Sequence, residues 1–431
     1  MGRLFFYMGK SRTIIKGGYV VGYGKTDIAI CDGKISAREQ NIDATAEDNI
    51  INAEGLTIAP AFVDVHVHLR EPGYGYKERI ATGTMAAARG GYSTVCPMPN
   101  LNPVPDSVET LKAEQDIIDR DAKIEVLPYA AITIERKGRE LVDIASLHDK
   151  VCAFSDDGSG VQEDEMMERA MSEVAKYDAL IAAHCEVESL LHGGYIHDGE
   201  YARQHNHKGI CSESEWGQVK RDIEIAERVG CRYHVCHIST KETVELIRQA
   251  KARGVKVTCE TGPHYLIYCD MDLQEDARWK MNPPLRSAED RDALIEGIKD
   301  GTIDMIATDH APHSVEEKSK GLKDSAMGIV GLETAFAALN THLVKRGVIT
   351  LERLVELMSL NPRRVFRIEG GLEIGDRADI VLLDTDKQWR VDSSKFFSMG
   401  KITMFDGKDM VGDIALTMHR GEVVYDNRQN Q

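Results

Sequence analysis

The strongest constraint on the fold is a series of short apolar segments, rich in β-branched residues, that recurs through the middle of the chain. Each segment is followed by a polar or glycine-rich loop and then by a helical stretch, a pattern typical of a parallel sheet. The eight segments are TIAPAFVDVHVHL (57–69), YSTVCPMPN (92–100), IEVLPYAAIT (124–133), VCAFSDDG (151–158), ALIAAHCE (179–186), RYHVCHIST (232–240), VKVTCETGPHYL (255–266) and IDMIATDHAPH (303–313). They predict an α/β protein built on a closed (β/α)8 barrel of the TIM type.

The stretches between these segments support the same fold. In DSVETLKAEQDIIDRD (106–121) and TKETVELIRQAKARG (240–254) the apolar residues recur at helical spacing, which predicts amphipathic helices. An open, doubly wound sheet is the alternative fold. A dinucleotide-binding sheet of that kind carries a glycine-rich phosphate turn after its first strand, and HVHLREPG (66–73) is not such a turn.

The two ends of the chain have a different pattern. Residues 11–57 and 375–428 alternate apolar and polar residues between turn-forming Gly and Asp, as strands with one solvent-facing side do. We therefore expect a small β-sandwich domain built from residues 1–57 and 371–431. The barrel is expected to occupy residues 58–370.

Charge and cysteine usage exclude several classes of protein. The formal charge is -17, from 53 basic and 70 acidic residues, and no Lys/Arg-rich run predicts a nucleic-acid partner. The nine cysteines form no C-x-x-C pair and indicate a reduced, cytoplasmic protein. The apolar patch in MGRLFFYMGKSR (1–12) is too short for a signal peptide, and no run of about 18 apolar residues predicts a membrane span.

Polar residues stand at the carboxyl end of most of the expected barrel strands, the rim where barrel enzymes assemble their active sites. They are His66, His68, Asp156, Asp157, His184, His234, His237, Asp309, His310 and His313. His66 and His68 are two residues apart, so both face the same side of an extended strand. Imidazole and carboxylate groups that share one face suit zinc or a similar divalent ion.

A single histidine on a strand is more often a hydrogen-bonded core residue than a metal ligand, and His197, His205 and His207 are assigned that structural role. The H-x-H pair alone is also a short motif that arises by chance. The presence of such residues at the ends of several strands favours a metal site. Five strands that end in His or Asp would leave many unsatisfied polar groups at an apolar barrel mouth, each costing about 1–3 kcal/mol, unless a shared ion satisfied them.

The order of motifs is also similar to that of a known family. HVHLREPG followed by KE, then PMPN, FSDDG, AHCE, HVCHIST, NPPLR and ATDHAPH, resembles the bacterial dihydroorotases of the amidohydrolase superfamily over nearly the whole chain. The resemblance implies reversible, zinc-dependent cyclisation of N-carbamoyl-L-aspartate to dihydroorotate in pyrimidine biosynthesis. It also implies that the protein forms a homodimer or associates with aspartate carbamoyltransferase.

The resemblance assigns roles to individual residues. It implies two zinc ions bridged by Asp157 and a hydroxide, one held by His66, His68 and Asp309 and the other by His184 and His237. Asp309 would also be the catalytic acid/base that carries the proton from the attacking hydroxide to the departing ring nitrogen. The substrate contacts implied are Arg70, Asn100, Asn282, His313 and the backbone of Met327 and Gly328.

Two of these assignments can be tested against the spacing of the residues along the expected strands. Many relatives bridge their metals with a carboxylated lysine, but Lys150 precedes Asp157 by seven positions, about 23 Å of extended chain, and faces the other side. The choice of Asp157 over Asp156 rests on the resemblance alone. His234 and His237 are an odd number of residues apart and cannot both face inward on a strand, so His237 is the expected ligand and His234 the structural or outward residue.

The segment HSVEEKSKGLKDSAMGIVG (313–331) is long for a barrel loop and suits an active-site lid, although an ordinary solvated loop explains the same pattern. Its SAMG departs from the proline that relatives usually carry before this turn, which weakens the expected backbone contacts of Met327 and Gly328.

Two rival functions remain open. One is another cyclic amidase, such as a hydantoinase, dihydropyrimidinase or allantoinase, although these act mostly on uncharged rings and have no evident need for Arg70. The other is a catalytically silent dihydroorotase-like subunit, which loss of metal ligands would reveal; none is lost here.

Overall fold

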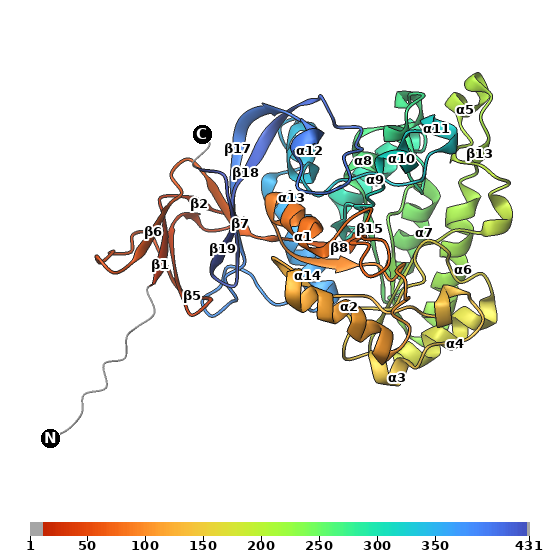
Figure 1. The fold of residues 1–431 in the computed structure, drawn as a ribbon, viewed down its shortest axis with the longest axis horizontal. Coiled ribbons are helices and arrows are strands. Elements are labelled where there is room, and N and C mark those ends of the chain that lie inside the picture. Colours follow the sequence, from red (N-terminus) through yellow and green to blue (C-terminus); the bar gives the residue numbers. More distant parts are fainter. Residues whose placement is uncertain (1–11, 429–431) are drawn as a thin grey trace.

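Parallel strands form the centre of the larger part of the molecule in a computed structural model that describes residues 12–428 (Figure 1). β8 (Phe62–Val67), β9 (Tyr92–Pro97) and β10 (Glu125–Val126) pair side by side in the order β10-β9-β8. A second series has the order β11-β14-β15-β16, with bounds Leu180–Ala183, Arg232–Val235, Val257–Thr261 and Met305–Ile306. The expectation about the N-terminal patch falls on residues 1–11, outside the described residues.

Single parallel bridges link the two series at both ends. Ala130, beyond β10, pairs with Phe154, and Phe154 pairs with Ile181 of β11. At the other end His310, beyond β16, pairs with Val67 of β8. The parallel pairings therefore lead from β8 through both series and back to β8. The expected strand at 151–158 contributes only the bridges of Phe154.

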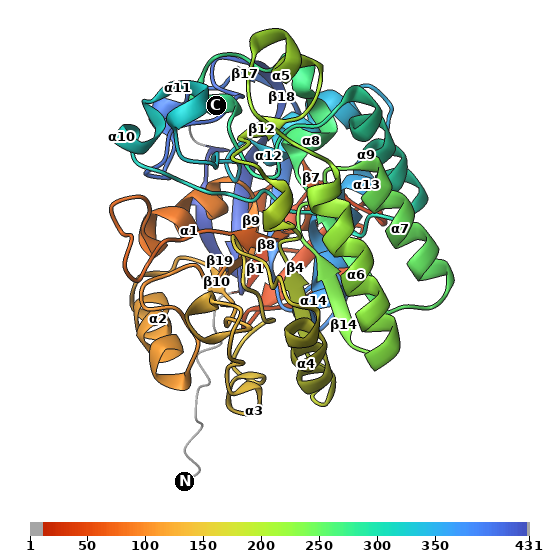
Figure 2. The same ribbon diagram turned by 90° about the vertical axis from the view of Figure 1, so that its right-hand side faces the viewer.

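Helices cover the outside of these strands (Figure 2). Those in the connections between strands are α1 (Ile80–Arg89), α2 (Val108–Asp121), α3 (Ile144–Leu147), α4 (Asp164–Ala175), α6 (Glu213–Val229), α7 (Lys241–Ala252) and α9 (Ala288–Asp300). The helices expected at 106–121 and 240–254 are confirmed as α2 and α7. α7 begins after Thr240, whose side chain caps the Thr243 N–H, and it buries Val244 and Ile247 at helical spacing.

Further elements lie in the longer connections and after β16. They are β12 (Ile196–His197), β13 (Gly209–Ile210), α5 (Glu200–His205), α8 (Pro263–Ile267), α10 (Val315–Lys318), α11 (Gly321–Asp324), α12 (Ala335–Leu339), α13 (Leu351–Val355) and α14 (Asn361–Phe366). Among residues 12–428, no helix combines the length and the apolar character that crossing a bilayer requires.

Strands from both ends of the chain lie together beside the helices and parallel strands (Figure 1). A six-stranded sheet has the order β19-β18-β17-β7-β2-β3, and a four-stranded sheet has the order β5-β4-β1-β6. The bounds are β1 (Thr13–Lys16), β2 (Tyr19–Val20), β3 (Gly24–Lys25), β4 (Asp27–Cys31), β5 (Lys34–Glu39), β6 (Asn49–Asn52), β7 (Thr57–Pro60), β17 (Ile380–Arg390), β18 (Asp409–His419) and β19 (Glu422–Asp426). Ile15 and Ile28 of one sheet share a hydrophobic cluster with Ile58 and Leu382 of the other.

The segment 57–69 is not one strand, so this part of the sequence-based expectation is wrong. β7 pairs with β17 in the terminal sheet, whereas β8 pairs with β9. The partners change at Ala61, whose N–H bonds to Asp379 O, while the next N–H, of Phe62, bonds to Gly91 O. The apolar run continues across this change because both strands are buried.

Candidate active site

Polar side chains from the carboxyl ends of the parallel strands surround one cavity of about 260 Å³. This volume lies near the lower end of the range for small-molecule sites, about 300 Å³. Eleven of the twelve predicted site residues line the cavity: His68, Arg70, Asn100, Asp157, His184, His237, Asn282, Asp309, His313, Met327 and Gly328. The twelfth, His66, is fully buried on β8.

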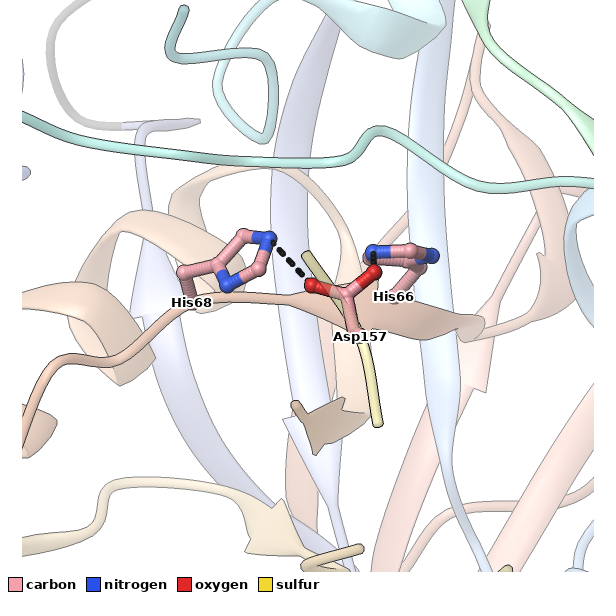
Figure 3. A group of neighbouring side chains, drawn as sticks. All are labelled: His66, His68 and Asp157. Carbon is pink, nitrogen blue, oxygen red and sulfur yellow. Dashed lines mark ion pairs between the residues drawn. The ribbon is translucent and has the colours of Figure 1, made fainter. Parts of the chain in front are cut away.

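Asp157 lies among four histidines. Its Oδ1 atom is 3.4 Å from Nε2 of His66, and its Oδ2 atom is 3.7 Å from Nε2 of His68 (Figure 3). On the other side, Oδ1 is 3.8 Å from Nδ1 of His184 and 3.8 Å from Nε2 of His237. Two groups with the spacing of metal ligands therefore share this carboxylate: His66, His68 and Asp157, and Asp157, His184 and His237.

Asp309 completes the first of these groups. Its Oδ1 atom is 3.0 Å from Nε2 of His68 and 3.6 Å from Nε2 of His66. The residue follows β16 with a left-handed backbone, φ 47°. His237 (φ 31°) and Arg70 (φ 64°) share this unusual backbone, which non-glycine residues adopt rarely and which concentrates at functional sites.

Hydrogen bonds orient the two histidines of the H-x-H pair. Nδ1 of His66 lies 2.8 Å from Oε1 of Glu260, and Nδ1 of His68 lies 2.9 Å from Oδ1 of Asn100. Because these oxygens can only accept, each Nδ1 carries the hydrogen and each Nε2 keeps its lone pair toward Asp157 and Asp309. A carboxylate or carbonyl behind the imidazole is the usual support of a metal-ligating histidine.

The unpaired atoms at the centre of the cluster fit a cation. Nε2 of His66 and Oδ1 of Asp157 are buried and have no hydrogen-bond partner in the described part of the chain, and both are acceptors in the arrangement just described. Two buried acceptors that face each other are costly unless a positive ion lies between or beside them. Nitrogen and oxygen ligands of this kind suit a divalent metal such as zinc. The residues therefore fit the metal that the sequence predicts.

Both carboxylates of the cluster remain ionised. When no metal is bound, a second proton on His66 takes the place of the ion. Burial raises the pKa of Asp157, but the charge of this imidazolium and hydrogen bonds from His237 and His66 outweigh burial and hold the pKa well below its ordinary value. Burial likewise raises the pKa of Asp309, but its 3.0 Å contact with His68 and the charge of His66 outweigh burial and lower the pKa. Asp309 is therefore available as a proton acceptor at neutral pH.

Arg70 and His313 form one wall of the cavity. Arg70 is only 7% exposed, its Nε donates to Pro312 O at 3.2 Å, and it forms no ion pair within residues 12–428. A structural role for Arg70 would require an ion pair with a neighbouring acidic residue such as Glu71 or Glu78. Neither forms it: Glu71 accepts from Ile80 N–H, and Glu78 accepts from Ser398 and Met399. Arg70 therefore brings to the cavity a positive charge that has no direct ion-pair partner among residues 12–428.

His313 is neutral and its tautomer is defined. Nε2 lies 2.8 Å from Met327 O, a pure acceptor, so Nε2 carries the hydrogen. Nδ1 then accepts from Lys77 Nζ at 3.4 Å. Burial and the charges of Arg70 and Lys77 lower the pKa of His313 to about 3, which keeps the imidazole uncharged across the neutral range.

The adjacent part of the lining contains the Met327–Gly328 turn, which contacts His313, and Asn282. Asn282 Nδ2 donates to Glu186 Oε1 at 2.9 Å and lies 3.5 Å from Nε2 of His184. The Gly328 N–H donates to Lys280 O at 3.0 Å. A side chain at Gly328 would lie 2.7 Å from Ala311 O, so only glycine allows this close approach.

Several other rim residues have structural roles. Asp156 turns away from the histidines and accepts from the N–H groups of Ile132 and Thr133 at 2.8 and 3.1 Å. His310 accepts at Nδ1 from Gly331 N–H at 3.2 Å. Lys150 is exposed and pairs with Asp149 at 2.8 Å. None of the three lines the cavity, and neither do the other histidines assigned a structural role, His197, His205 and His207.

His234 and His237 both point into the protein, but at different depths. His234 lies on β14, is fully buried, and bonds to Thr258 Oγ1 at 2.8 Å and Glu260 Oε2 at 3.1 Å. It is a structural residue, and the alternative of an outward position is wrong. β14 ends at Val235, so the alternation of strand faces does not extend to His237.

Sequence reasoning missed three carboxylates that support the site. Glu260 holds His66, Asp64 accepts from the N–H groups of His66 and Thr308 at 3.1 Å, and Glu186 holds Asn282. Burial raises the pKa of Asp64 to about 7. A signal was present for the first two, since each is an acidic residue inside an apolar strand segment, where unpaired charges are rare.

Comparison with known proteins gives a consistent result. Residues 55–243 match a family model described as dihydro-orotase-like. The chain is 49% identical to a dihydroorotase of Fusobacterium nucleatum over 94% of this chain and 96% of that protein. It is 50% identical to one of Geobacillus kaustophilus over 93% and 95%, respectively.

Solved structures share the fold. L-hydantoinase (dihydropyrimidinase) from Arthrobacter aurescens superposes with a TM-score of 0.87 at 30% identity, covering 96% of each chain. Dihydropyrimidinase from Brevibacillus agri, at 22% identity, has a TM-score of 0.84 over 97% of this chain and 95% of that one.

An α/β fold of this type, with histidines and carboxylates gathered around a cavity at the carboxyl ends of its strands, defines an enzyme of the cyclic amide hydrolase class. Identity of about half the residues over nearly the whole length narrows the class further. The chain belongs to the dihydroorotase family.

Proposed function

We propose that this enzyme interconverts dihydroorotate and N-carbamoyl-L-aspartate in pyrimidine biosynthesis. The observation that carries the substrate assignment is the buried guanidinium of Arg70, which lies at the cavity without a carboxylate partner in the described part of the chain. A guanidinium can bind a substrate carboxylate through two parallel charge-assisted hydrogen bonds. Dihydroorotate carries such a carboxylate beside its amide ring.

The proposal includes a fold and a cofactor. A closed (β/α)8 barrel that begins with β8, over residues 62–370, accounts for the pairings that return to β8. A β-sandwich of residues 12–60 and 371–428, which includes β7, accounts for the shared cluster of the two terminal sheets. Two zinc ions would fit the two ligand groups that share Asp157. His66, His68 and Asp309 would hold one ion, and His184 and His237 the other. A cytoplasmic location agrees with the free state of all nine cysteines.

Each group at the site has a separate role in the reaction. The metal ions, when bound, lower the pKa of water for attack on the ring carbonyl and polarise that carbonyl. Asp309, ionised and directed at the same cluster, accepts the proton of the attacking water and delivers it to the ring nitrogen as the amide bond breaks. Glu260 and Asn100 fix the histidine tautomers. Arg70, with Asn100 and His313, holds the substrate carboxylate, while Asn282 and the Met327–Gly328 turn line the ring site.

Comparing the activity on dihydroorotate with that on dihydrouracil tests the proposed function. Dihydrouracil is the dihydroorotate ring without the carboxylate, so it would leave the buried Arg70 unpaired in the complex. We expect wild-type kcat/KM to favour dihydroorotate by about 10³-fold or more. Comparable rates on the two rings would contradict the proposal and favour a broader cyclic amidase like the hydantoinase neighbour.

A further inference from the structure

Lys318 is a buried cation outside the predicted site. It is the last residue of α10 and only 4% exposed. Its Nζ donates to three backbone carbonyls, those of Gly328 at 2.8 Å, Ala326 at 2.9 Å and Lys280 at 3.2 Å. No carboxylate forms an ion pair with it among residues 12–428. All three donors of the ammonium are therefore used on backbone oxygens.

These three carbonyls belong to the two segments that form one wall of the cavity. Ala326 and Gly328 flank Met327, and Lys280 lies two residues before Asn282. The Gly328 N–H bonds to the same Lys280 carbonyl, which joins the two segments directly. Lys280 adds a second link, because its own Nζ donates to Lys323 O at 2.5 Å. One ammonium thus connects α10 to both parts of the wall.

The arrangement needs the charged form of Lys318. A protonated amine has three N–H donors, which matches three acceptors, whereas a neutral amine has two donors and a lone pair that would face an oxygen. Burial and the charge of Lys280 lower the pKa of Lys318 to about 7, and Asp276 opposes them. The ammonium is therefore the main form below neutral pH.

We propose that Lys318 is a positioning residue that holds the Met327–Gly328 turn against the Asn282 segment and so shapes the ring-binding wall of the cavity. The proposal rests on the proposed function, because it concerns binding of the same substrate. Lys318 touches neither the metal cluster nor Asp309, so its loss should affect substrate binding more than the chemical step.

The test is the Lys318→Met variant assayed with dihydroorotate at pH 6.5. We expect KM to rise about tenfold or more, kcat to stay within about threefold of wild type, and metal content to be unchanged. Lys320→Met is the matched control, because Lys320 is an exposed lysine of the same loop, and its KM should equal that of wild type.

An unchanged KM would overturn the proposal, whether or not kcat falls. A fall in kcat at constant KM is what a purely structural residue gives when part of the protein is unfolded. If Lys318→Met does not fold, Lys318→Gln, which keeps an N–H donor group, is assayed in the same way, and an unchanged KM there overturns the proposal equally. Absence of wild-type turnover would instead refute the proposed function.

Discussion

The Nδ1 nitrogen of His66 donates to Oε1 of Glu260 across 2.8 Å, and the second oxygen of Glu260 lies 3.1 Å from Nε2 of His234. This buried chain, which links β8, β15 and β14, leaves the other nitrogen of His66 free for a ligand. Burial raises the pKa of Glu260, but its hydrogen bonds to His234 and His66 outweigh burial and lower the pKa to about 2. The carboxylate therefore stays charged and defines the tautomer of His66.

Glu260→Gln should weaken metal binding without removing any predicted ligand. The amide is a poorer acceptor than the carboxylate, so His66 loses part of its orientation, and a loss of about tenfold or more in metal affinity is expected. Competition with a chromogenic chelator measures the affinity. Glu114→Gln is a control, since Glu114 is buried on α2 away from the cavity. Equal affinities of Glu260→Gln and wild type would contradict the role of Glu260.

His66→Ala should reduce metal content and turnover together. Protein saturated with zinc is expected to contain close to two ions per chain, and the variant fewer, because a ligand on the shared cluster is lost. Elemental analysis after removal of excess metal gives the stoichiometry. Full activity with less than one ion per wild-type chain would refute the binuclear centre.

Asp309→Asn should retain the fold and much of the metal while kcat falls by about 10²-fold or more, the contribution expected of a general acid/base. An amide can still lie beside His68 but cannot accept and release the proton. Steady-state kinetics across pH measures the loss. Asp156→Asn, which alters only the contacts with Ile132 and Thr133, should leave kcat per folded molecule nearly unchanged. Near-normal turnover by Asp309→Asn would move the proton transfer to another group.

Arg70→Met should remove most of the preference for dihydroorotate over dihydrouracil. Methionine keeps the apolar volume of the side chain but cannot bind a carboxylate, so kcat/KM for dihydroorotate should fall while that for dihydrouracil changes little. The ratio of the two values, measured in parallel with wild type, is the readout. A variant that keeps the wild-type ratio would show that another group recognises the anion.

Glu333 should make stability depend on pH below neutrality. Burial raises its pKa from 4.5 to about 7, although N–H groups of Ser398 and Phe397 partly oppose the shift. The folded state then binds a proton more tightly than the unfolded state. Its contribution to the free energy of unfolding is complete below pH 4.5 and is lost as pH rises through about 7, a change of about 3 kcal/mol. Denaturant unfolding of wild type and Glu333→Gln at several pH values measures it; parallel profiles would contradict it.

Local pattern was sufficient for much of the architecture. The helices at 106–121 and 240–254 follow from apolar spacing, and the alternation of strands and helices predicts the parallel pairing, because side-chain periodicity reports which face of an element is buried. Local pattern does not show which strand pairs with which. TIAPAFVDVHVHL is uniformly apolar, and nothing in it shows that β7 joins the C-terminal β17 while β8 joins β9.

Part of the site could likewise be predicted from the sequence, and the rest is shown only by the folded chain. Residue type and place at the strand ends were enough to identify His66, His68, Asp157, His184 and Asp309 as candidates, since few side chains can bind a metal. Only the folded chain shows that Asp157 faces the histidines while Asp156 bonds to Thr133. It also shows that Arg70 has no acidic partner among residues 12–428, and that Lys318 joins two distant segments. Orientation and pairing depend on contacts between residues far apart in the chain, and a strained backbone such as that of His237 departs from the alternation on which sequence reasoning relies.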